Sequence, residues 1–397
     1  MRLAVVSHKE CVLDPASGDH YTDGGFPLQM RAISELFTET RLLVPCAAPG
    51  SLEGLARLDG DQISVVPLKK LEGRDLRRKL NFLGWFFENG RVIWNEIRQA
   101  DAVHAPIPGD VGTIGLVFAL IQRKPLFVRH CGNWTVQKTA AEKFWKWCME
   151  TFAGGTNVML ATGGGDDPPS NRNLNVKWIF STSLSKEQIA NARSKTLPVR
   201  GPIRLIIACR QERNKGTDIV LRSFAKIRRS VPNAVLDVVG GGSLLPGLKE
   251  LAAELRLEDS VTFHGKVTQA EVLNLLASAH IFCYPTTASE GFPKVVAEAL
   301  ANGLPVVTTR VSVLPQVIRE GCGVLIEPTP DDLATAVVKI CIDEKGYAQM
   351  SAAAVKVASR FTLERWRDLI AENLDAAWSP IFQQTRKPVP QSGRSSV

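Results

Sequence analysis

Short apolar runs alternate with amphipathic segments along almost the whole chain. The runs indicate strands at 3–6, 40–44, 63–66, 102–104, 126–128 and 158–161 in the first half, and at 204–208, 235–239, 261–263, 281–284, 305–308 and 323–326 in the second. Many of the segments between them favour helices, most clearly where Leu333, Val337 and Ile340 recur at helical spacing. Repeated alternation of strand and helix predicts parallel sheets that are covered by helices on both faces.

A break in the alternating pattern, marked by proline and glycine, predicts two doubly wound, Rossmann-like domains. Two prolines and a glycine at 198–202 interrupt the pattern, so we expect an N-terminal domain at 1–198 and a C-terminal domain at 199–361. A helix is expected at 362–382, returning to the N-terminal domain, and a disordered tail at 383–397. Ligands of open α/β sheets bind at the carboxyl ends of the strands, so the expected site is an interdomain cleft.

Composition and charge narrow the class of protein. The chain has 397 residues, 45% of them hydrophobic, and a formal net charge of +8. This charge suits nucleic acid, an anionic membrane or a phosphate-bearing substrate, but no nucleic-acid motif is present. Eight cysteines without a Cys-x-x-Cys pair indicate buried, reduced thiols rather than zinc or disulfides. With no signal peptide and no apolar stretch of about 18 residues, we expect a cytoplasmic protein.

The segment 289–307 contains the most informative pattern. It follows a predicted strand, Pro293 suits the first turn of a helix, and Gly303 suits the end of that helix. The positive pole of such a helix would face the cleft, where exposed amides suit a phosphate or sugar oxygen. We expect three residues to supply these amides, namely Gly291, Phe292 and Lys294.

Glu290 and Glu298 stand eight positions apart in the same segment. Eight helical residues span about 12 Å, so one carboxylate could reach a sugar and the other a ribose. The alternative is one solvated surface glutamate and one capping glutamate. The segment 208–216 adds Arg210 at a strand end and Lys215 before the next helix, and both could reach one diphosphate. Surface positions for both cations are the alternative.

Four further positions follow predicted strands or precede a helix. Gly241 lies in a glycine-rich turn, and Val267 follows His264 at another strand end, where that histidine could equally be a packing residue. In the first domain, Gly24 and Gly25 follow a long first loop, and a simple tight turn is the alternative to close approach by a ligand.

His130 ends the predicted strand near 126–128 and would face the cleft. A structural histidine is the alternative, and the adjacent Arg129 is an expected acceptor or phosphate contact. No Asp-x-Asp metal motif lies in segments 208–216, 239–243, 263–267 and 289–307, so we expect neither a metal nor another cofactor, and positive side chains with helix dipoles would take the place of a divalent ion.

These motifs together resemble those of retaining GT-B glycosyltransferases, particularly glycosyltransferase family 4. The segment from Glu290 onward is similar to the Glu-x7-Glu signature of this family. The segment 208–216 is similar to its Gly-Arg-x-x-x-x-Lys-Gly motif, with Cys209 in place of glycine. The chain departs from the family at Pro293, where many relatives have glycine, and at 178–184, where they have Ile-Pro-Asn-Gly-Val-Asp.

The resemblance implies a role for each matched residue. Arg210 and Lys215 would bind the diphosphate, Glu290 the transferred sugar and Glu298 the ribose. The same resemblance places Gly241 beside the donor and the backbone near Val267 at the nucleobase. In the first, acceptor-binding domain, Gly24 and Gly25 would approach the sugar and diphosphate, and His130 would lie near the reacting sugar.

The resemblance therefore implies a retaining hexosyltransferase that uses a nucleotide-diphosphate sugar and a glycan, glycolipid or lipid-linked acceptor. A nucleotide-sugar epimerase of the same fold and a non-catalytic membrane-associated scaffold are the alternatives. Basic residues at 69–79, aromatic residues at 81–87 and the mixture at 143–147 could bind the inner face of a membrane. Ordinary helices that bury their aromatic side chains would give the same pattern.

Overall fold

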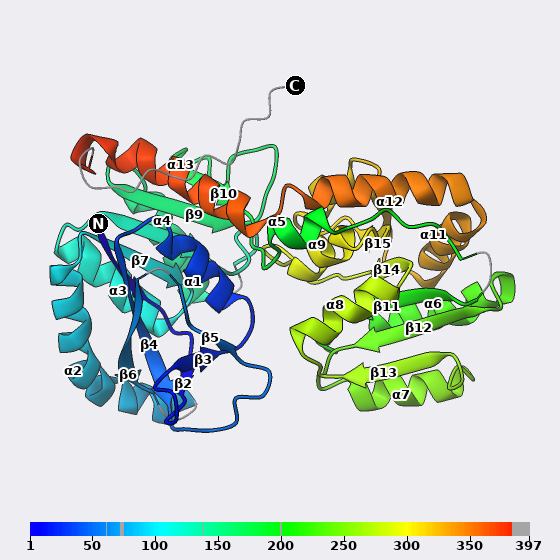
Figure 1. Ribbon diagram of the computed structural model, residues 1–397, viewed down its shortest axis with the longest axis horizontal. Helices are drawn as coiled ribbons and strands as arrows, with labels where there is room; N and C mark the ends of the chain where they lie inside the picture. Colours follow the sequence, from blue (N-terminus) through cyan, green and yellow to red (C-terminus); the bar gives the residue numbers. More distant parts are fainter. Residues whose placement is uncertain (61, 72–74, 138, 199–200, 383–397) are drawn as a thin grey trace. The chain divides into compact units, whose positions relative to one another are not determined.

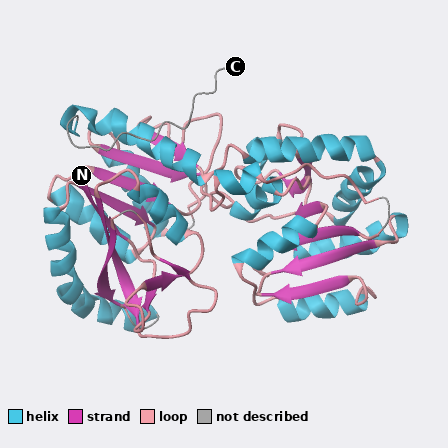
Figure 2. Cartoon of the chain, viewed as in Figure 1, coloured by secondary structure: helices cyan, strands magenta, loops and turns pink. Residues whose placement is uncertain are grey.

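The computed structural model describes residues 1–60, 62–71, 75–137, 139–198 and 201–382, and it divides into two compact units. Unit 1 comprises 1–162, 166–179 and the chain from Trp366 onward, and unit 2 comprises 163–165 and 180–365. In each unit helices cover a central sheet (Figure 2). The predicted tail at 383–397 lies outside the described residues.

Unit 1 is built on a ten-stranded sheet in the order β10-β9-β8-β7-β1-β4-β2-β3-β5, with β6 paired to β4 (Figure 1). Its strands are β1 (Arg2–Val6), β2 (Cys11–Leu13), β3 (His20–Thr22), β4 (Glu39–Ala47), β5 (Ala56–Arg57), β6 (Ile63–Lys69), β7 (Ala102–Ile107), β8 (Leu126–His130), β9 (Asn157–Thr162) and β10 (Val176–Ile179). The sheet is parallel except at β3, which pairs antiparallel to β2 and β5. The predicted parallel sheet is thus extended by short strands inside the segment expected to be a long loop.

The helices of unit 1 are α1 (Phe26–Ser34), α2 (Asp75–Gln99), α3 (Asp110–Ile121), α4 (Ala140–Phe152) and, from Trp366, most of α13 (Leu363–Phe382). Helix α3 packs closely on the sheet because Gly112 and Gly115 lack side chains. A Cβ at Gly112 would lie 2.2 Å from the carbonyl oxygen of Pro106, and one at Gly115 would lie 2.5 Å from Cβ of Val6. Side chains from β7, β8 and α3 form much of the core beneath these helices.

Unit 2 contains a six-stranded, fully parallel sheet in the order β13-β12-β11-β14-β15-β16. The strands are β11 (Ile203–Ala208), β12 (Ala234–Val239), β13 (Val261–Gly265), β14 (Ile281–Tyr284), β15 (Val306–Thr309) and β16 (Gly323–Ile326). This is the doubly wound order, and the strand order reverses between β11 and β14. Such a switch point opens a crevice at the carboxyl ends of the strands.

The helices of unit 2 are α5 (Lys186–Ala190), α6 (Thr217–Ser230), α7 (Leu245–Glu254), α8 (Gln269–Ser278), α9 (Lys294–Ala301), α10 (Leu314–Ile318), α11 (Pro330–Ile342) and α12 (Glu344–Ala358). Helix α6 buries Val220, Leu221, Phe224 and Ile227, which share one helical face, in the core of the unit. Among the described residues, no helix is both long enough and apolar enough to cross a membrane.

The division between the units differs from the predicted boundary at residue 198. Residues 180–198 belong to unit 2, and hydrogen bonds explain why. Thr182 donates to the carbonyl of Phe361 at 2.6 Å, and Lys195 donates to the carbonyl oxygens of Ala277 at 2.6 Å and Ala279 at 2.8 Å. The division between the units therefore lies on the N-terminal side of residue 180 and not at the stretch rich in proline and glycine.

Helix α13 belongs to unit 1 from Trp366 to Phe382. Trp366, Ile370, Leu374 and Trp378 recur at helical spacing on α13 and are buried. The indole of Trp378 donates to the carbonyl of Thr156 at 2.9 Å. The amphipathic face of this helix therefore provides its attachment to the unit.

Candidate active site

The carboxyl ends of β11, β12 and β13 surround a cavity of about 510 Å³ in unit 2. Arg210, Gly241, Val267 and Glu298 line it, and each was predicted from the sequence to face a ligand. The cavity lies beside the switch point of the sheet, where doubly wound folds bind nucleotides. The structure thus brings residues from four separate segments to one place.

Gln211 fixes the shape of the loop after β11. Its side chain is fully buried, and its amide nitrogen donates to the carbonyls of Cys209 and Val239, each at 3.0 Å. Thr217 donates to its amide oxygen at 2.7 Å, and the backbone N–H of Gln211 donates to Gly241 at 2.9 Å. Sequence reasoning missed this residue because an uncharged polar side chain in a predicted loop is ordinarily exposed.

Two glycines allow the turn after β12 to pack directly on this loop. Gly240 has a φ of 115°, and a Cβ there would lie 1.9 Å from the carbonyl oxygen of Cys209. A Cβ at Gly242 would lie 2.3 Å from the carbonyl oxygen of Gln211. Backbone packing at this closeness requires glycine, so the glycine-rich turn has a structural role in shaping the cavity.

Lys215 and Glu290 form an ion pair beside the switch point. Their side chains are 12% and 26% exposed, so the pair is partly shielded from water. The hydroxyl of Tyr284 donates to the same carboxylate at 3.2 Å. Burial lowers the pKa of Lys215, and burial raises the pKa of Tyr284. Sequence reasoning did not single out Tyr284, because it ends an apolar strand and reads as a core residue.

Backbone contacts hold the loops of Lys215 and Glu290 together. The carbonyl of Asn214 accepts hydrogen bonds from the N–H groups of Thr287 at 3.0 Å and Ala288 at 3.1 Å. Gly216 has a φ of 79°, and a Cβ there would lie 2.4 Å from the carbonyl oxygen of Pro285. The ion pair is therefore built on two loops that share hydrogen bonds.

Arg210 differs from Lys215 in its surroundings. Its side chain is 76% exposed and lies 3.4 Å from Glu212, which is itself solvent-accessible. An exposed pair of this kind contributes little to stability. Arg210 therefore lines the cavity and can exchange Glu212 for a more highly charged anion at little cost.

Glu298 is a buried carboxylate on α9. Its side chain accepts hydrogen bonds from Ser183 at 2.9 Å and Gln269 at 3.1 Å, and both reach Oε1. Burial raises the pKa of the carboxyl, and these hydrogen bonds oppose the shift. Ser183 was missed, although it lies in the segment 178–184 where the sequence departs from the family pattern.

The start of α9 corrects one detail of the prediction. Pro293 is the residue before the helix, with φ of −78° and ψ of 99°, and Lys294 begins the first turn. Phe292 is 9% exposed and packs its ring against Phe180 and Phe361, with centroids 6.0 Å and 5.0 Å apart. Its side chain is therefore structural, and only its backbone remains a candidate contact. Gly291 lies in the same loop.

His264 adopts the packing alternative. Its Nε2 lies 2.8 Å from Oδ1 of Asp237, and Arg204 donates to Oδ2 of the same buried carboxylate at 2.9 Å. These contacts join β11, β12 and β13 within the sheet. The side chain thus has a partner of its own, as a strand-packing residue would.

The candidates of unit 1 occupy different surroundings. His130 ends β8, is 1% exposed and meets Trp134 edge-on at 5.4 Å. Burial lowers its pKa to about 4, and its Nδ1 has no hydrogen-bond partner within the described part of the chain. Gly24 has a φ of 71° that favours glycine, and Gly25 precedes the first turn of α1.

Arg129 was expected to contact an acceptor or phosphate, but it is buried within unit 1. It donates to Gln29 at 2.9 Å, and its guanidinium lies 5.1 Å from the ring centre of Trp366. These contacts tie β8 to α1 and to the terminal helix. The Nε of Arg129 is buried and has no hydrogen-bond partner among the described residues.

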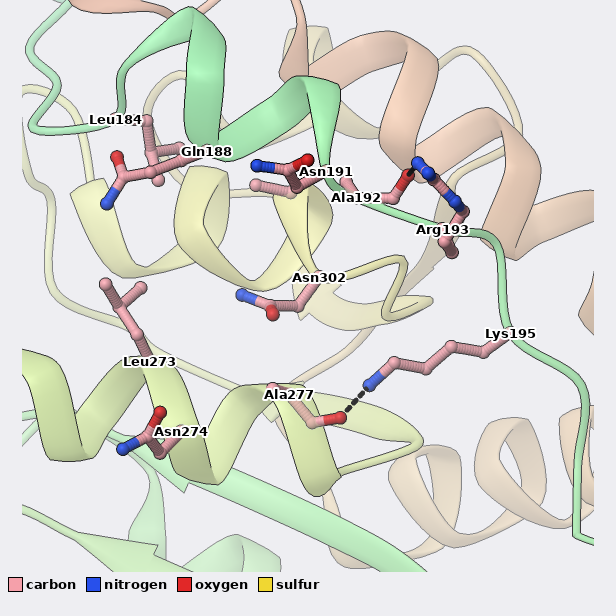
Figure 3. A pocket seen from close by; sticks show the side chains of 11 residues that line it. Leu184, Gln188, Asn191, Ala192, Arg193, Lys195, Leu273, Asn274, Ala277 and Asn302 are labelled. Atoms are coloured by element: carbon pink, nitrogen blue, oxygen red, sulfur yellow. Dashed lines mark hydrogen bonds between the residues drawn. The ribbon is translucent and has the colours of Figure 1, made fainter.

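Unit 2 has a second cavity of about 430 Å³ (Figure 3). None of the residues that line it was predicted to belong to the site. It lies between α5, α8 and the end of α9, and its polar residues include Gln188, Asn191 and Asn302. Lys195 points to the end of α8, where it donates to Ala277. Burial lowers the pKa of Lys195 to about 8. This lysine stabilises the last carbonyls of a helix.

Comparison with known proteins agrees with this geometry. Residues 188–357 match the family described as glycosyl transferases group 1. The chain is 32% identical over 162 residues to GDP-mannose-dependent alpha-(1-6)-phosphatidylinositol monomannoside mannosyltransferase of Mycolicibacterium smegmatis, covering 38% of this chain and 41% of that protein. It is 32% identical over 199 residues to D-inositol 3-phosphate glycosyltransferase of Thermobifida fusca, covering 47% and 45%. Each match spans less than half of the curated relative.

Solved structures match over nearly the whole chain. HepE of Anabaena in complex with UDP and glucose has a TM-score of 0.66 at 20% identity, covering 94% of this chain and 99% of that one. Sucrose-phosphate synthase of Thermosynechococcus elongatus has a TM-score of 0.67 at 15% identity, covering 96% and 100%. The chain therefore has the GT-B fold of glycosyltransferases, as predicted.

Residues 188–357, which lie within the second unit, match the model of glycosyl transferases group 1, in agreement with the resemblance to glycosyltransferases that the sequence motifs predict. Transfer of a hexose is the class of reaction that the names of the mannosyltransferase relatives indicate.

Proposed function

We propose that this protein is a retaining glycosyltransferase that transfers a sugar from a nucleotide-diphosphate donor to a lipid-linked acceptor. The observation that carries the proposal is the convergence of Arg210, Gly241, Val267 and Glu298 on one cavity, with the Lys215–Glu290 pair at the adjoining strand end. These groups supply cations for a diphosphate and carboxylates for hydroxyl groups.

The nucleoside of the donor would occupy the cavity. Glu298 is suited to the ribose because a carboxylate accepts hydrogen bonds from two neighbouring hydroxyl groups. Ser183 and Gln269 hold its Oε1, which fixes the direction in which the carboxylate faces. The backbone around Val267 would meet the nucleobase, and Gly241 would let the chain approach the donor closely.

The diphosphate would bind Lys215 and Arg210. When the diphosphate arrives, it replaces Glu290 as the counter-charge of Lys215, and the freed carboxylate accepts hydroxyl hydrogens of the sugar. The bond between the anomeric carbon and the diphosphate oxygen then breaks, and the nucleoside diphosphate leaves with its electron pair. The acceptor oxygen bonds to the anomeric carbon on the same face, and its proton passes to an oxygen of the departing diphosphate.

The two cations would stabilise the charge that develops on the leaving diphosphate. We propose that they, together with the amides of Gly291 and Lys294 at the start of α9, act without a divalent ion, since segments 208–216 and 289–307, which supply these groups, contain no Asp-x-Asp. His130 would lie near the sugar. Its ring is neutral at pH 7, so Nδ1 or Nε2 can exchange hydrogen bonds with a hydroxyl group.

A lipid-linked acceptor is supported by the relatives and by the surface of unit 1. Several relatives are named for phosphatidylinositol or its mannoside. On α2, Leu83 is 64% and Phe87 is 78% exposed, and on α4, Phe144 is 45% and Trp147 is 50% exposed. Exposed aromatic side chains near basic residues suit the surface of an anionic membrane. Trp85, by contrast, is buried and donates to Lys69, as in an ordinary packed helix.

The proposal is tested by incubating the purified chain with a panel of nucleotide-diphosphate sugars, with and without phosphatidylinositol-type lipids. Acceptor-dependent release of nucleoside diphosphate, with an α-linked product from an α-linked donor by NMR, is the expected result. Epimerised donor in the absence of acceptor would favour an epimerase instead. Binding of no nucleotide sugar in a thermal-shift panel would favour a non-catalytic scaffold.

A further inference from the structure

Three strands of unit 1 bring two thiols and an imidazole to one face of the sheet. Strand β2 pairs parallel to β4 with Cys11 opposite Cys46, and β2 pairs antiparallel to β3 with Leu13 opposite His20. Alternate residues of a strand share a face, so Cys11 and Leu13 project to the same side. Their partners Cys46 and His20 therefore project there too.

The side-chain atoms converge as the register requires. The two sulfur atoms and a ring nitrogen of His20 all lie within 4.8 Å of one another. Cys11 is 1% exposed, whereas Cys46 and His20 are half-buried, so the cluster can be reached from solvent. The cluster is separate from the candidate site residue His130, because β2 and β3 lie across β4 from β8 in the strand order.

Two thiolates and one imidazole are a donor set that suits zinc. With zinc–sulfur bonds of about 2.3 Å, tetrahedral ligands lie roughly 3.8 Å apart, so small rotations of the side chains would bring these three into position. Soft sulfur ligands disfavour magnesium and calcium, which prefer oxygen. Three protein ligands leave a fourth position for water.

The charged neighbours of the cluster already have partners. Glu10, next to Cys11, forms an ion pair with Lys70 at 2.7 Å, and Asp19, next to His20, forms one with Arg57 at 2.8 Å. No disulfide joins Cys11 to Cys46, since both are free thiols. The sulfur and nitrogen atoms are therefore the groups that converge on a common centre.

We propose that Cys11, His20 and Cys46 bind one zinc ion, with water in the fourth position. The ion would join the hairpin of β2 and β3 to the end of β4. This proposal differs from the expectation of thiols without a metal role, and it stands independently of the proposed function. Because the hairpin leads directly into the turn at Gly24, the ion would also restrict the movement of that turn.

The test uses the full chain without an affinity tag, treated with a chelator and then titrated with Co²⁺ and Zn²⁺. One equivalent of Co²⁺ should give the near-ultraviolet charge-transfer band of a cobalt–thiolate bond, and Zn²⁺ should displace it. Cys46→Ser and His20→Gln should weaken zinc binding roughly a hundredfold or more, because each removes a ligand. Cys131→Ser is the matched control, since it removes an exposed thiol elsewhere in unit 1.

A variant that fails to fold is recognised by circular dichroism, and a second measurement then uses the wild-type chain alone. Zinc should slow alkylation of Cys46 and Cys11 while leaving the alkylation rate of Cys131 unchanged. Absence of a cobalt–thiolate band in the wild type, or equal zinc affinity in all variants, would overturn the proposal. A mass lower by two hydrogens, with Cys11 and Cys46 linked in the freshly purified protein, would also overturn it in favour of a redox pair.

Discussion

Three candidate residues of unit 2 are held by an ion pair or by side-chain hydrogen bonds, and the candidate residues of unit 1 differ in this respect. Lys215 and Glu290 neutralise each other, and Glu298 is fixed by two hydrogen bonds. In unit 1, His130 is buried with an unpartnered nitrogen among the described residues, and Gly24 lies in an open turn. Under the proposed function, the residues that bind the donor are therefore organised within one unit, by loops that follow neighbouring strands of a single sheet.

The largest expected effect comes from removing the charge of Lys215 in unit 2. Lys215→Ala should lower kcat by about a thousandfold, because it removes a charge that stabilises the leaving diphosphate. Steady-state kinetics with an identified donor measure this, and circular dichroism checks the fold. Lys226→Ala is the matched control, since Lys226 pairs with Asp331 at the surface of the same unit. A wild-type kcat in Lys215→Ala would reject the assigned role.

A substitution in unit 1 sharpens the comparison. His130→Asn should lower kcat roughly 10- to 100-fold, because a neutral ring that positions a hydroxyl group is lost. His104 is a matched buried histidine on the adjacent strand, and its Nδ1 lies 2.9 Å from the carbonyl oxygen of Phe127. We expect His104→Asn to lower the melting temperature and to leave kcat of the folded fraction near wild type. The opposite pattern would transfer the catalytic assignment away from His130.

Glu298 tests whether the buried carboxylate serves donor binding. Glu298→Gln keeps a hydrogen-bond acceptor for Ser183 but loses the charge, so KM for the donor should rise about tenfold with a smaller change in kcat. Glu250→Gln, an exposed position on α7, is the control and should change neither constant. If KM stays at its wild-type value while only stability changes, Glu298 has a structural role.

Two glycines of unit 2 separate site geometry from general stability. Gly242→Ala should destabilise the fold by about 1–3 kcal/mol, because the added Cβ would meet the backbone of Gln211 at 2.3 Å. Gly247→Ala places its Cβ in open space on α7 and should stabilise by about 0.5–1 kcal/mol. Urea unfolding measures both changes. Equal stability of the two variants would contradict the close packing of the glycine turn.

The smallest effect concerns pH. Burial lowers the pKa of His280 to about 4, and its Nδ1 accepts a hydrogen bond from the N–H of Arg204 at 2.9 Å. Since the folded pKa lies below the unfolded value of about 6.5, protonation favours the unfolded chain as pH falls from about 6.5 to 4. The ring is partly exposed, so the loss is on the order of 1 kcal/mol after solvent screening.

His280→Asn keeps an acceptor for Arg204 and cannot be protonated in this range. Its urea-unfolding free energy should therefore fall less steeply than that of the wild type between pH 6.5 and 4. Identical slopes for the two proteins would show that His280 does not titrate as inferred.

The alternation of apolar and polar positions was sufficient to predict the long parallel strands and both doubly wound units. It was not sufficient for β2, β3 and β5, which have only two or three residues each, or for β10, in which only the first and last of four residues are buried. Residues 180–198 group with unit 2, whereas the proline and glycine at 198–202 predict a boundary at 198. The packing of 180–198 depends on contacts with residues far away in sequence, such as the hydrogen bond from Thr182 to Phe361.

Motifs predicted the ends of the strands well but gave little information on the residues that support them. One cavity is lined by four residues that were each inferred from a sequence segment following or near a predicted strand, namely Arg210, Gly241, Val267 and Glu298. Ser183 and Gln211 form hydrogen bonds to residues far away in sequence, Glu298 and Val239, which no local pattern encodes. Tyr284 bonds to Glu290 only six positions on, but it ends an apolar strand and resembles a core residue. The pairing of Lys215 with Glu290 was equally beyond the sequence, since it joins positions 75 residues apart (290 − 215).

The Lys215–Glu290 pair has a consequence for selectivity under the proposed function. At rest the cation is satisfied internally, so a passing anion gains little by entering. Inorganic phosphate would have to break the pair and leave Glu290 without a counter-charge or a sugar hydroxyl group. An intact donor, by contrast, gives Lys215 a diphosphate and Glu290 a sugar hydroxyl at the same time. Recognition of the complete molecule over its fragments is thereby built into the resting state.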